Sequence, residues 1–278
     1  MGIFKYNHEN HDISGALETY QDLGFVVVEN VLVDEAVDAI RRSTKTFLGE
    51  LAEKPEESMH YHGIIEELPL VLELLVNRKV MDLVDAICGN DVTLTRSAAI
   101  IRQPDYGGMH WHRDQCAPAY ATSQRASLNL GPFVSVWFHL TGLRPNEGGL
   151  AVIPRSHQAE YEAPDGFVAA PKLRSFCRPG QVVPSSCMDF SCVEPIECGS
   201  NDMVLFAGQL FHAVYPHSGE TERVSIGLSF TPSCDENMLP PQTSFAASFV
   251  RSQSKEVKKY LSKYPGWDAE WGSRLEIK

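Results

Sequence analysis

The sequence predicts a mainly β fold, an antiparallel sandwich or barrel braced by helices. Three observations predict it. Apolar residues at helical spacing dominate about the first 90 residues. Seven or eight short runs of strand-like composition follow at about residues 91–233, and a second helical pattern occupies the tail at about residues 240–278. Because no repeat or linker separates these parts, we expect a single domain over residues 1–278.

The expected helices follow apolar residues spaced three and four apart. Asp34 is expected to cap the second helix and Pro69 to begin the third. Between them, Lys54–Glu67 is polar and carries His60 and His62, which we interpret as part of a solvated loop or lid, because no strand periodicity surrounds them. The helices are expected at Ile13–Gly24, Glu35–Leu51, Leu70–Cys88 and Phe245–Tyr264.

The expected strands are short and are separated by turn residues. The first is a continuous β-branched run typical of a strand buried inside a sheet. Cys116–Gly131 reads as a loop, and the proline- and cysteine-rich stretch Arg155–Ser200 as an insertion over one rim of the fold. The strands are expected at Phe25–Val31, Val92–Gln103, His110–Asp114, Phe133–Thr141, Leu150–Pro154, Asp202–Ala207, Phe211–Tyr215 and Arg223–Thr231.

Composition excludes several classes of protein. The 24 basic and 36 acidic residues give a formal net charge of -12, which argues against broad binding to nucleic acid or to an anionic membrane. No apolar run approaches the roughly 18–20 residues that span a bilayer. The seven cysteines are odd in number and include no C-x-x-C pair, so we expect a reduced, cytoplasmic protein.

The run G-G-M-H-W-H-R-D-Q at Gly107–Gln115 carries the most specific chemistry. It places His110, His112 and Asp114 at alternate positions, and alternate residues of a strand point to one face. Two imidazoles and a carboxylate gathered in this way commonly hold a divalent metal ion. The segment therefore predicts a metal site, with the identity of its third ligand still open.

His212 and Arg223 flank a turn-like segment between two strand-like runs. We expect a hairpin that places these two residues across from one another on one face, with Ser225 two residues further on the same face. His212 would then join His112 and Asp114 in a set of two histidines and one carboxylate. Such a set holds non-haem Fe(II) and leaves positions open for a chelating co-substrate and O2. An arginine beside it would bind a distal carboxylate, which fits 2-oxoglutarate.

At this point the chain resembles a known family. The matching features are H-R-D at His112–Asp114, the strand containing Trp137, E-G-G-L-A-V-I-P-R-S-H at Glu147–His157, and His212 followed by R-V-S at Arg223–Ser225. In this order they resemble the phytanoyl-CoA dioxygenase family of Fe(II)/2-oxoglutarate-dependent oxygenases. The resemblance implies a double-stranded β-helix, a jelly-roll or cupin-like barrel braced here by the N-terminal helices.

The resemblance also implies roles for individual residues. His112, Asp114 and His212 would be the iron ligands, Arg223 with Ser225 would hold the distal carboxylate of 2-oxoglutarate, and Trp137 would lie near the co-substrate. His110 is interpreted as a hydrogen-bonding wall residue or as a residue beyond a strand edge, although a regular strand would place it on the ligand face. A cupin site needs a Glu shortly after the histidines, and none follows; halogenating relatives have a small residue where Asp114 stands.

The expected function is oxidative decarboxylation of 2-oxoglutarate coupled to hydroxylation, or to desaturation, epoxidation or rearrangement, of a small-molecule metabolite, with O2 as second co-substrate. Natural-product biosynthesis is the favoured setting, and the protein is expected to be a monomer or homodimer. Two alternatives stay open: a non-catalytic ligand-binding barrel and an acyl-CoA hydroxylase. The acidic composition disfavours the latter, since the phosphates of coenzyme A need a basic rim.

Overall fold

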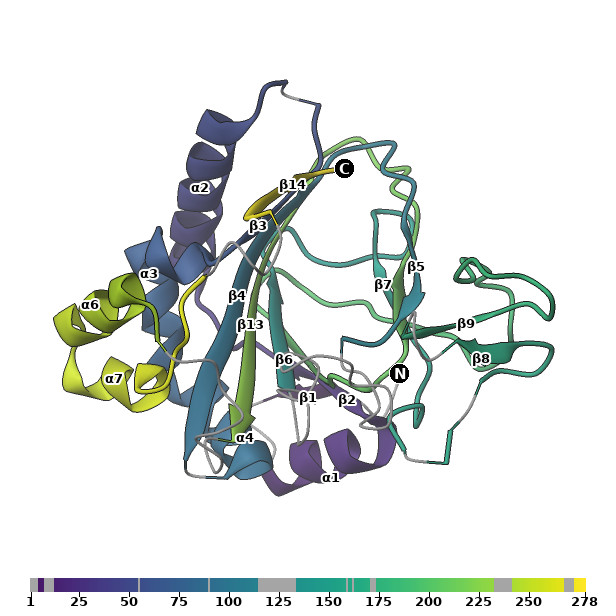
Figure 1. The fold of residues 1–278 in the computed structure, drawn as a ribbon, viewed down its shortest axis with the longest axis horizontal. Helices are drawn as coiled ribbons and strands as arrows, with labels where there is room; N and C mark the ends of the chain where they lie inside the picture. The colour runs from purple at the N-terminus through teal and green to yellow at the C-terminus, as the bar shows by residue number, and fades with distance from the viewer. Residues whose placement is uncertain are drawn as a thin grey trace.

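Two β-sheets face each other in this protein, and helices cover the outer face of the larger one (Figure 1). The computed structural model describes residues 5–7, 13–54, 56–89, 91–114, 134–158, 160–161, 163–170, 174–232, 242–267 and 273–278. The expected loop Cys116–Gly131 lies outside these residues. The mainly β double-stranded β-helix expected from the sequence is confirmed.

The larger sheet has eight strands in the order β1-β2-β11-β6-β13-β4-β3-β14. Its longest pair is β4 with β13, which run antiparallel along almost their whole length. The strands are β1 (Lys5–Asn7), β2 (Phe25–Glu29), β3 (Met59–His62), β4 (Val92–Arg102), β6 (Val134–His139), β11 (Met203–Ala207), β13 (Arg223–Pro232) and β14 (Leu275–Ile277).

The smaller sheet has four strands in the order β10-β7-β12-β5, and a separate two-stranded ribbon pairs β8 with β9. All pairs in both are antiparallel. The strands are β5 (Met109–His112), β7 (Leu150–Val152), β8 (Val168–Ala170), β9 (Ser175–Cys177), β10 (Glu194–Pro195) and β12 (His212–Val214). Three of these, β8 to β10, fall in the stretch Arg155–Ser200 that the sequence suggested was irregular.

The helices pack on the side of the large sheet that faces away from the small one (Figure 1). Their buried residues form one core with alternate residues of the central strands, such as Val224, Ile226 and Leu228 of β13. The helical segments are α1 (Ile13–Leu23), α2 (Asp34–Leu51), η1 (Ile64–Glu66), α3 (Pro69–Leu72), η2 (Glu73–Leu75), α4 (Arg78–Cys88), α6 (Ser244–Ser252) and α7 (Lys255–Leu261). None of the described helices is long and apolar enough to cross a membrane.

Alternate side chains of the large sheet point toward the small sheet, on the face opposite the helices. In β2, Val26 and Val28 pack under the helices, whereas Phe25 and Val27 pack against residues of the small sheet. The apolar run of β2 is therefore buried on both faces, as its composition indicated. In β13 the same period points Arg223 away from the helices, because its neighbour Val224 belongs to the helix-facing core.

Several sequence expectations about these elements are wrong. Residues 59–62 form an ordered strand and not a solvated loop, because β3 pairs with β4 on one side and β14 on the other. The expected helix after Pro69 is broken, and its last part begins only after Asn77, whose side chain caps α4 by accepting from the Lys79 N–H. Asp34 lies inside the first turn of α2 and makes no cap. The expected helical tail contains α6 and α7, but the chain then returns to the large sheet as β14.

Candidate functional site

His112 and His212 are direct cross-strand partners in the small sheet. Strand β12 pairs antiparallel with β5, and this register sets the two imidazoles side by side with their ring centroids 4.1 Å apart. Asp114 follows two residues after the end of β5. One ligand atom from each of the three residues lies within 4.8 Å of the other two, so the three could hold one metal ion.

Both histidines direct the same ring nitrogen, Nε2, toward the position where the three ligand atoms meet. The Nδ1 of His112 donates to the His110 carbonyl at 3.0 Å, and the Nδ1 of His212 donates to the Leu210 carbonyl at 3.0 Å. A carbonyl can only accept, so Nδ1 of each ring carries a proton, and the Nε2 atoms are the nitrogens that face the ligand position. Burial, followed by the field of His212, lowers the pKa of His112 to about 3, which keeps the ring neutral.

Asp114 completes the set as a carboxylate. Its Oδ2 accepts a hydrogen bond of 3.0 Å from the Ser135 hydroxyl of β6, which fixes its orientation. Its Oδ1 lies 3.7 Å from the Nε2 of His212, too far for a hydrogen bond but suitable for two ligands of one ion. Burial alone would raise the pKa of Asp114, but His212, His112 and Arg96 outweigh it and lower the pKa, so the anionic form persists. The three residues therefore fit a divalent metal ion.

Arg223 reaches the same cavity from the opposite sheet. The sequence suggested that His212 and Arg223 pair across a hairpin, and this is wrong: β12 pairs with β5 and β7, whereas β13 pairs with β4 and β6. The intervening segment crosses from one sheet to the other. Both side chains nevertheless line one cavity, because the inner faces of the two sheets point toward each other.

The guanidinium of Arg223 is held by a buried histidine. Its Nη1 donates to the Nδ1 of His139 at 3.3 Å, and the Ser225 hydroxyl lies 2.9 Å from the same nitrogen. Since the arginine can only donate, Nδ1 of His139 is the acceptor and the ring proton sits on Nε2. Ser225 is fully buried and is not among the residues that line the cavity; its hydroxyl lies against His139 instead. Burial, followed by the field of Arg102, lowers the pKa of Arg223 to about 9, which leaves it cationic at neutral pH.

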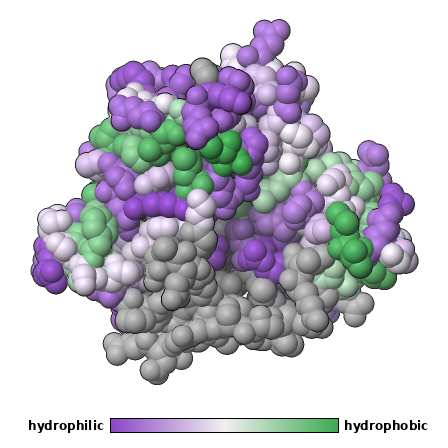
Figure 2. Space-filling model, turned by 45° about the horizontal axis from the view of Figure 1, so that its top comes forward, coloured by the Kyte–Doolittle hydropathy of each residue, from purple (hydrophilic) through white to green (hydrophobic). Residues whose placement is uncertain are grey.

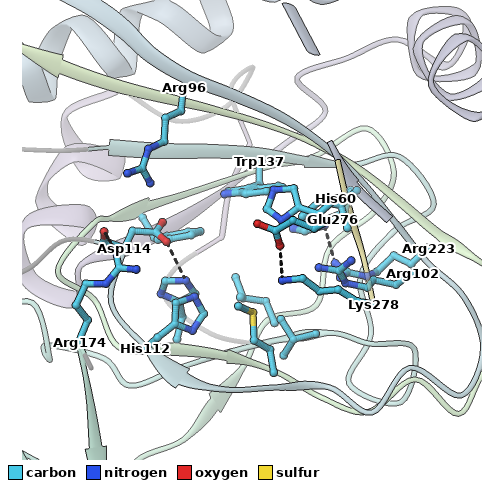
Figure 3. Close-up of a pocket in the computed structure, with 17 residues that line it drawn as sticks. His60, Arg96, Arg102, His112, Asp114, Trp137, Arg174, Arg223, Glu276 and Lys278 are labelled. Carbon is cyan, nitrogen blue, oxygen red and sulfur yellow. Dashed lines mark hydrogen bonds and ion pairs between the residues drawn. The ribbon is translucent and has the colours of Figure 1, made fainter. Parts of the chain in front are cut away.

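Unpartnered hydrogen-bond donors line the large-sheet side of this cavity (Figure 3). Among the described residues, no partner is found for the buried Nε of Arg102, the Nε of Arg223, the Nε1 of Trp137 or the Nε2 of His139. Buried donors without a partner are unusual, so a ligand that brings acceptor oxygens is expected here. Figure 3 shows His112 and Asp114 on one side of the cavity, with Arg174 beside Asp114, and Arg102 and Arg223 on the other side.

Trp137 has room on this wall because Gly227 of β13 is its cross-strand partner. A Cβ added at Gly227 would lie 2.7 Å from three indole carbon atoms. The absence of a side chain at Gly227 therefore leaves space for the indole, which lines the cavity.

His110 does not belong to the ligand group or to the cavity lining. It is half-buried, and its ring centroid lies 6.0 Å from that of His112. Its clearest contribution is the backbone carbonyl that orients His112. Sequence reasoning missed Arg102, Glu276 and Lys278 of the lining, because no motif links strands so far apart in the chain.

Figure 2 shows one face of the molecule, hollowed near its centre where hydrophilic residues gather. The cavity measures about 240 Å³, somewhat below the roughly 300–1,000 Å³ of sites for drug-sized ligands. It would accept small molecules.

Comparison with known proteins extends these observations. Residues 20–225 match the family model described as "Phytanoyl-CoA dioxygenase (PhyH)". No curated protein matches the chain.

Solved structures share the fold. HygX from Streptomyces hygroscopicus, crystallised with nickel and 2-oxoglutarate bound, has a TM-score of 0.63 at 16% identity, covering 78% of this chain and 86% of HygX. Its complex with nickel, 2-oxoglutarate and hygromycin B has a TM-score of 0.60 at 14% identity, covering 91% and 96%. The non-heme alpha-ketoglutarate-dependent epimerase SnoN from nogalamycin biosynthesis has a TM-score of 0.59 at 16% identity, covering 80% and 83%. At these identities the likeness establishes the fold.

Proposed function

Because the chain belongs to the phytanoyl-CoA dioxygenase family, we propose that it is an Fe(II)/2-oxoglutarate-dependent oxygenase acting on a small-molecule metabolite. In this proposal His112, Asp114 and His212 hold the iron, and Arg223 binds the distal carboxylate of 2-oxoglutarate. The observation that carries it is the meeting of a His-Asp-His group and a buried arginine in one cavity, from two opposite sheets.

The chain's own residues would prepare this site before any ligand arrives. Hydrogen bonds to backbone carbonyls hold the two Nε2 lone pairs in place, and Ser135 holds the carboxylate. Prepositioned ligands lower the cost of ordering on binding. When bound, the iron would supply the activation of O2 that is coupled to decarboxylation of 2-oxoglutarate.

The large-sheet wall would orient the co-substrate. The fork of Arg223 suits a carboxylate, and its Nη1 is already fixed by His139. The Nε2–H of His139 and the indole N–H of Trp137 would offer further donors to 2-oxoglutarate oxygens. Ser225 would act through His139, as a positioning residue.

Hydroxylation, desaturation, epoxidation or rearrangement would depend on how the substrate lies beside the iron. Two shared-fold neighbours support a small metabolite as substrate: HygX was crystallised with hygromycin B, and SnoN belongs to nogalamycin biosynthesis. For this chain, natural-product biosynthesis is therefore the setting we propose.

The test is anaerobic addition of Fe(II) and 2-oxoglutarate to the purified protein. A visible metal-to-ligand charge-transfer band should appear, and succinate should be released when O2 is admitted. Folded protein that shows no band would contradict the proposed function.

A further inference from the structure

Two buried arginines lie side by side on the cavity wall. Arg102 of β4 and Arg223 of β13 are cross-strand partners, and they are 2% and 6% exposed. Among the described residues, no carboxylate lies within the 4.0 Å of an ion pair with either guanidinium. Each Nε also lacks a hydrogen-bond partner among these residues. The pair therefore presents two desolvated positive charges to the cavity.

One molecule of 2-oxoglutarate satisfies only part of this charge. One of its carboxylates would chelate the metal, and the other would bind Arg223. Arg102 would then receive no carboxylate from 2-oxoglutarate. A buried charge without a counter-ion is unfavourable. The ring of Tyr106, 4.5 Å below the Arg102 guanidinium, compensates through its π-face but brings no negative charge. Glu276 also acts electrostatically on Arg102, but its carboxylate is paired with Lys278, so Arg102 and Lys278 together still carry more positive charge than Glu276 balances.

The last strand brings a further cation to the same place. β14 pairs with β3, so that Glu276 on this strand and Lys278 directly after it line the cavity (Figure 3). The Nζ of Lys278 lies 2.8 Å from Glu276 Oε2, so Glu276 is already paired. Next to them, the buried Nε2 of His60 has no partner among the described residues. Burial lowers the pKa of His60 well below its usual value, and the fields of His62, Arg102 and Lys278 lower it further.

His60, His62 and Glu276 also gather ligand atoms within 4.8 Å of one another, as a metal site would. Their surroundings disfavour a cation. Lys278 already neutralises the only carboxylate of the group, and Arg102 adds a further positive charge nearby. In a chain whose formal net charge is -12, this end of the cavity is locally basic. The charge distribution favours an anion over a metal ion.

We propose that the primary substrate carries an anionic group, a carboxylate or a phosphate, that binds between Arg102 and Lys278. This inference rests on the proposed function, because it assigns Arg223 to 2-oxoglutarate. It makes the segment Leu275–Lys278 a specificity element: Glu276 of β14 holds in place the ammonium of Lys278, the residue that follows the strand. The anionic end of the substrate would then anchor at the large sheet, with the reacting carbon directed toward the His-Asp-His group.

The test uses four probes of similar shape and different charge: benzoate, phenyl phosphate, benzyl alcohol and benzylammonium. The full chain is loaded anaerobically with Fe(II) and 2-oxoglutarate, so that Arg223 is occupied, and each probe is titrated by calorimetry. At least one anion should bind, with a Kd about tenfold or more below those of the neutral and cationic probes. Preference for benzoate or for phenyl phosphate identifies the anionic group as carboxylate or phosphate.

Variants locate the anion. Lys278→Met and Arg102→Met should each raise the Kd of the preferred anion about tenfold, whereas Lys255→Met, at an exposed lysine of α7, should leave it unchanged. Arg102→Met removes a buried side chain and could unfold the protein; Lys278→Met lies after the last strand and keeps the test decisive. Unchanged Kd values in Lys278→Met, tighter binding of benzylammonium, or binding of neither anion would overturn the inference.

Failure of the proposed function looks different. In that case no charge-transfer band forms on loading. The titrations are then repeated with the metal-free protein, where the difference between wild type and Lys278→Met still reports on the anion site.

Discussion

The two sheets that face each other across the cavity present different groups to it. From the small sheet come the Nε2 lone pairs of His112 and His212, joined by the carboxylate of Asp114 after β5. From the large sheet come N–H donors, led by Arg102 and Arg223. Electron-pair donors bind metal ions, whereas guanidiniums bind carboxylates. If each sheet has its own ligand, metal affinity and co-substrate affinity should be separable by mutation.

The largest expected effect is on metal binding, from a substitution in the small sheet. His212→Ala should weaken Fe(II) binding by more than about 100-fold and abolish the charge-transfer band, since loss of even an outer-shell partner costs about 10–100-fold. Anaerobic calorimetry with Fe(II) measures the affinity. The matched control is His110→Ala, on the same strand pair but outside the ligand group, which should keep the band. The reverse result would mean that His110 is the ligand.

Arg223→Leu should weaken the binding of 2-oxoglutarate and not that of the metal ion. Removing one partner of a buried charge pair costs about 2–5 kcal/mol, so the Kd of 2-oxoglutarate should rise correspondingly while Fe(II) affinity stays within about twofold. Arg223→Lys should be intermediate, because it keeps the charge and loses the fork. Arg251→Leu, on the exposed side of α6, should change neither affinity. Equal loss of metal and co-substrate in Arg223→Leu would contradict the separation.

Gly227→Ala tests how tightly the large-sheet wall is built. The new methyl group would overlap the Trp137 indole, so we expect a loss of about 1–3 kcal/mol in the free energy of unfolding, measured with urea. Gly107→Ala is the control, because nothing lies within 4 Å of its added Cβ and the change should stay within about 0.5 kcal/mol. Equal stability of the two variants would show that Trp137 has space to move.

The smallest effect concerns pH. Burial and the field of Arg223 hold the pKa of His139 well below 6.5, so the native ring stays neutral. Above about pH 6.5 the His139 ring is neutral in both the native and the unfolded protein. Below this pH the ring takes up a proton only in the unfolded protein, so the free energy of unfolding falls. Between about pH 7.5 and about pH 5.5, His139 should cost about 1.4 kcal/mol of metal-free stability. Urea unfolding of His139→Gln should lack this part of the pH dependence, and curves parallel to wild type would count against a neutral buried His139.

Sequence patterns predicted the fold class and grouped His112, Asp114 and His212, which the structure does bring together, but partly for the wrong reason. The sequence predicts a hairpin between His212 and Arg223, whereas His212 reaches His112 because β12 pairs with β5. Strand alternation predicts which face a side chain takes but not which sheet its strand joins. The single-domain organisation and the ligand roles of individual residues stay predictions.

The hydrogen-bond donors of the large sheet show more clearly what the sequence alone could not predict. Arg102, His60 and Lys278 become neighbours only through the order β13-β4-β3-β14. The absence of strand periodicity around His60 predicts a loop, whereas its short strand is held by pairing partners that lie far away in the chain. Nothing local in the sequence marks β14 as part of the cavity, since three residues carry no periodicity.

The most direct test of the division between the sheets is a crystal grown anaerobically with Fe(II) and 2-oxoglutarate, with diffraction measured at the iron absorption edge. The anomalous peak should lie among His112, Asp114 and His212, with the distal carboxylate of 2-oxoglutarate on Arg223. An iron peak at His60, His62 and Glu276, or a co-substrate that does not touch Arg223, would contradict the account.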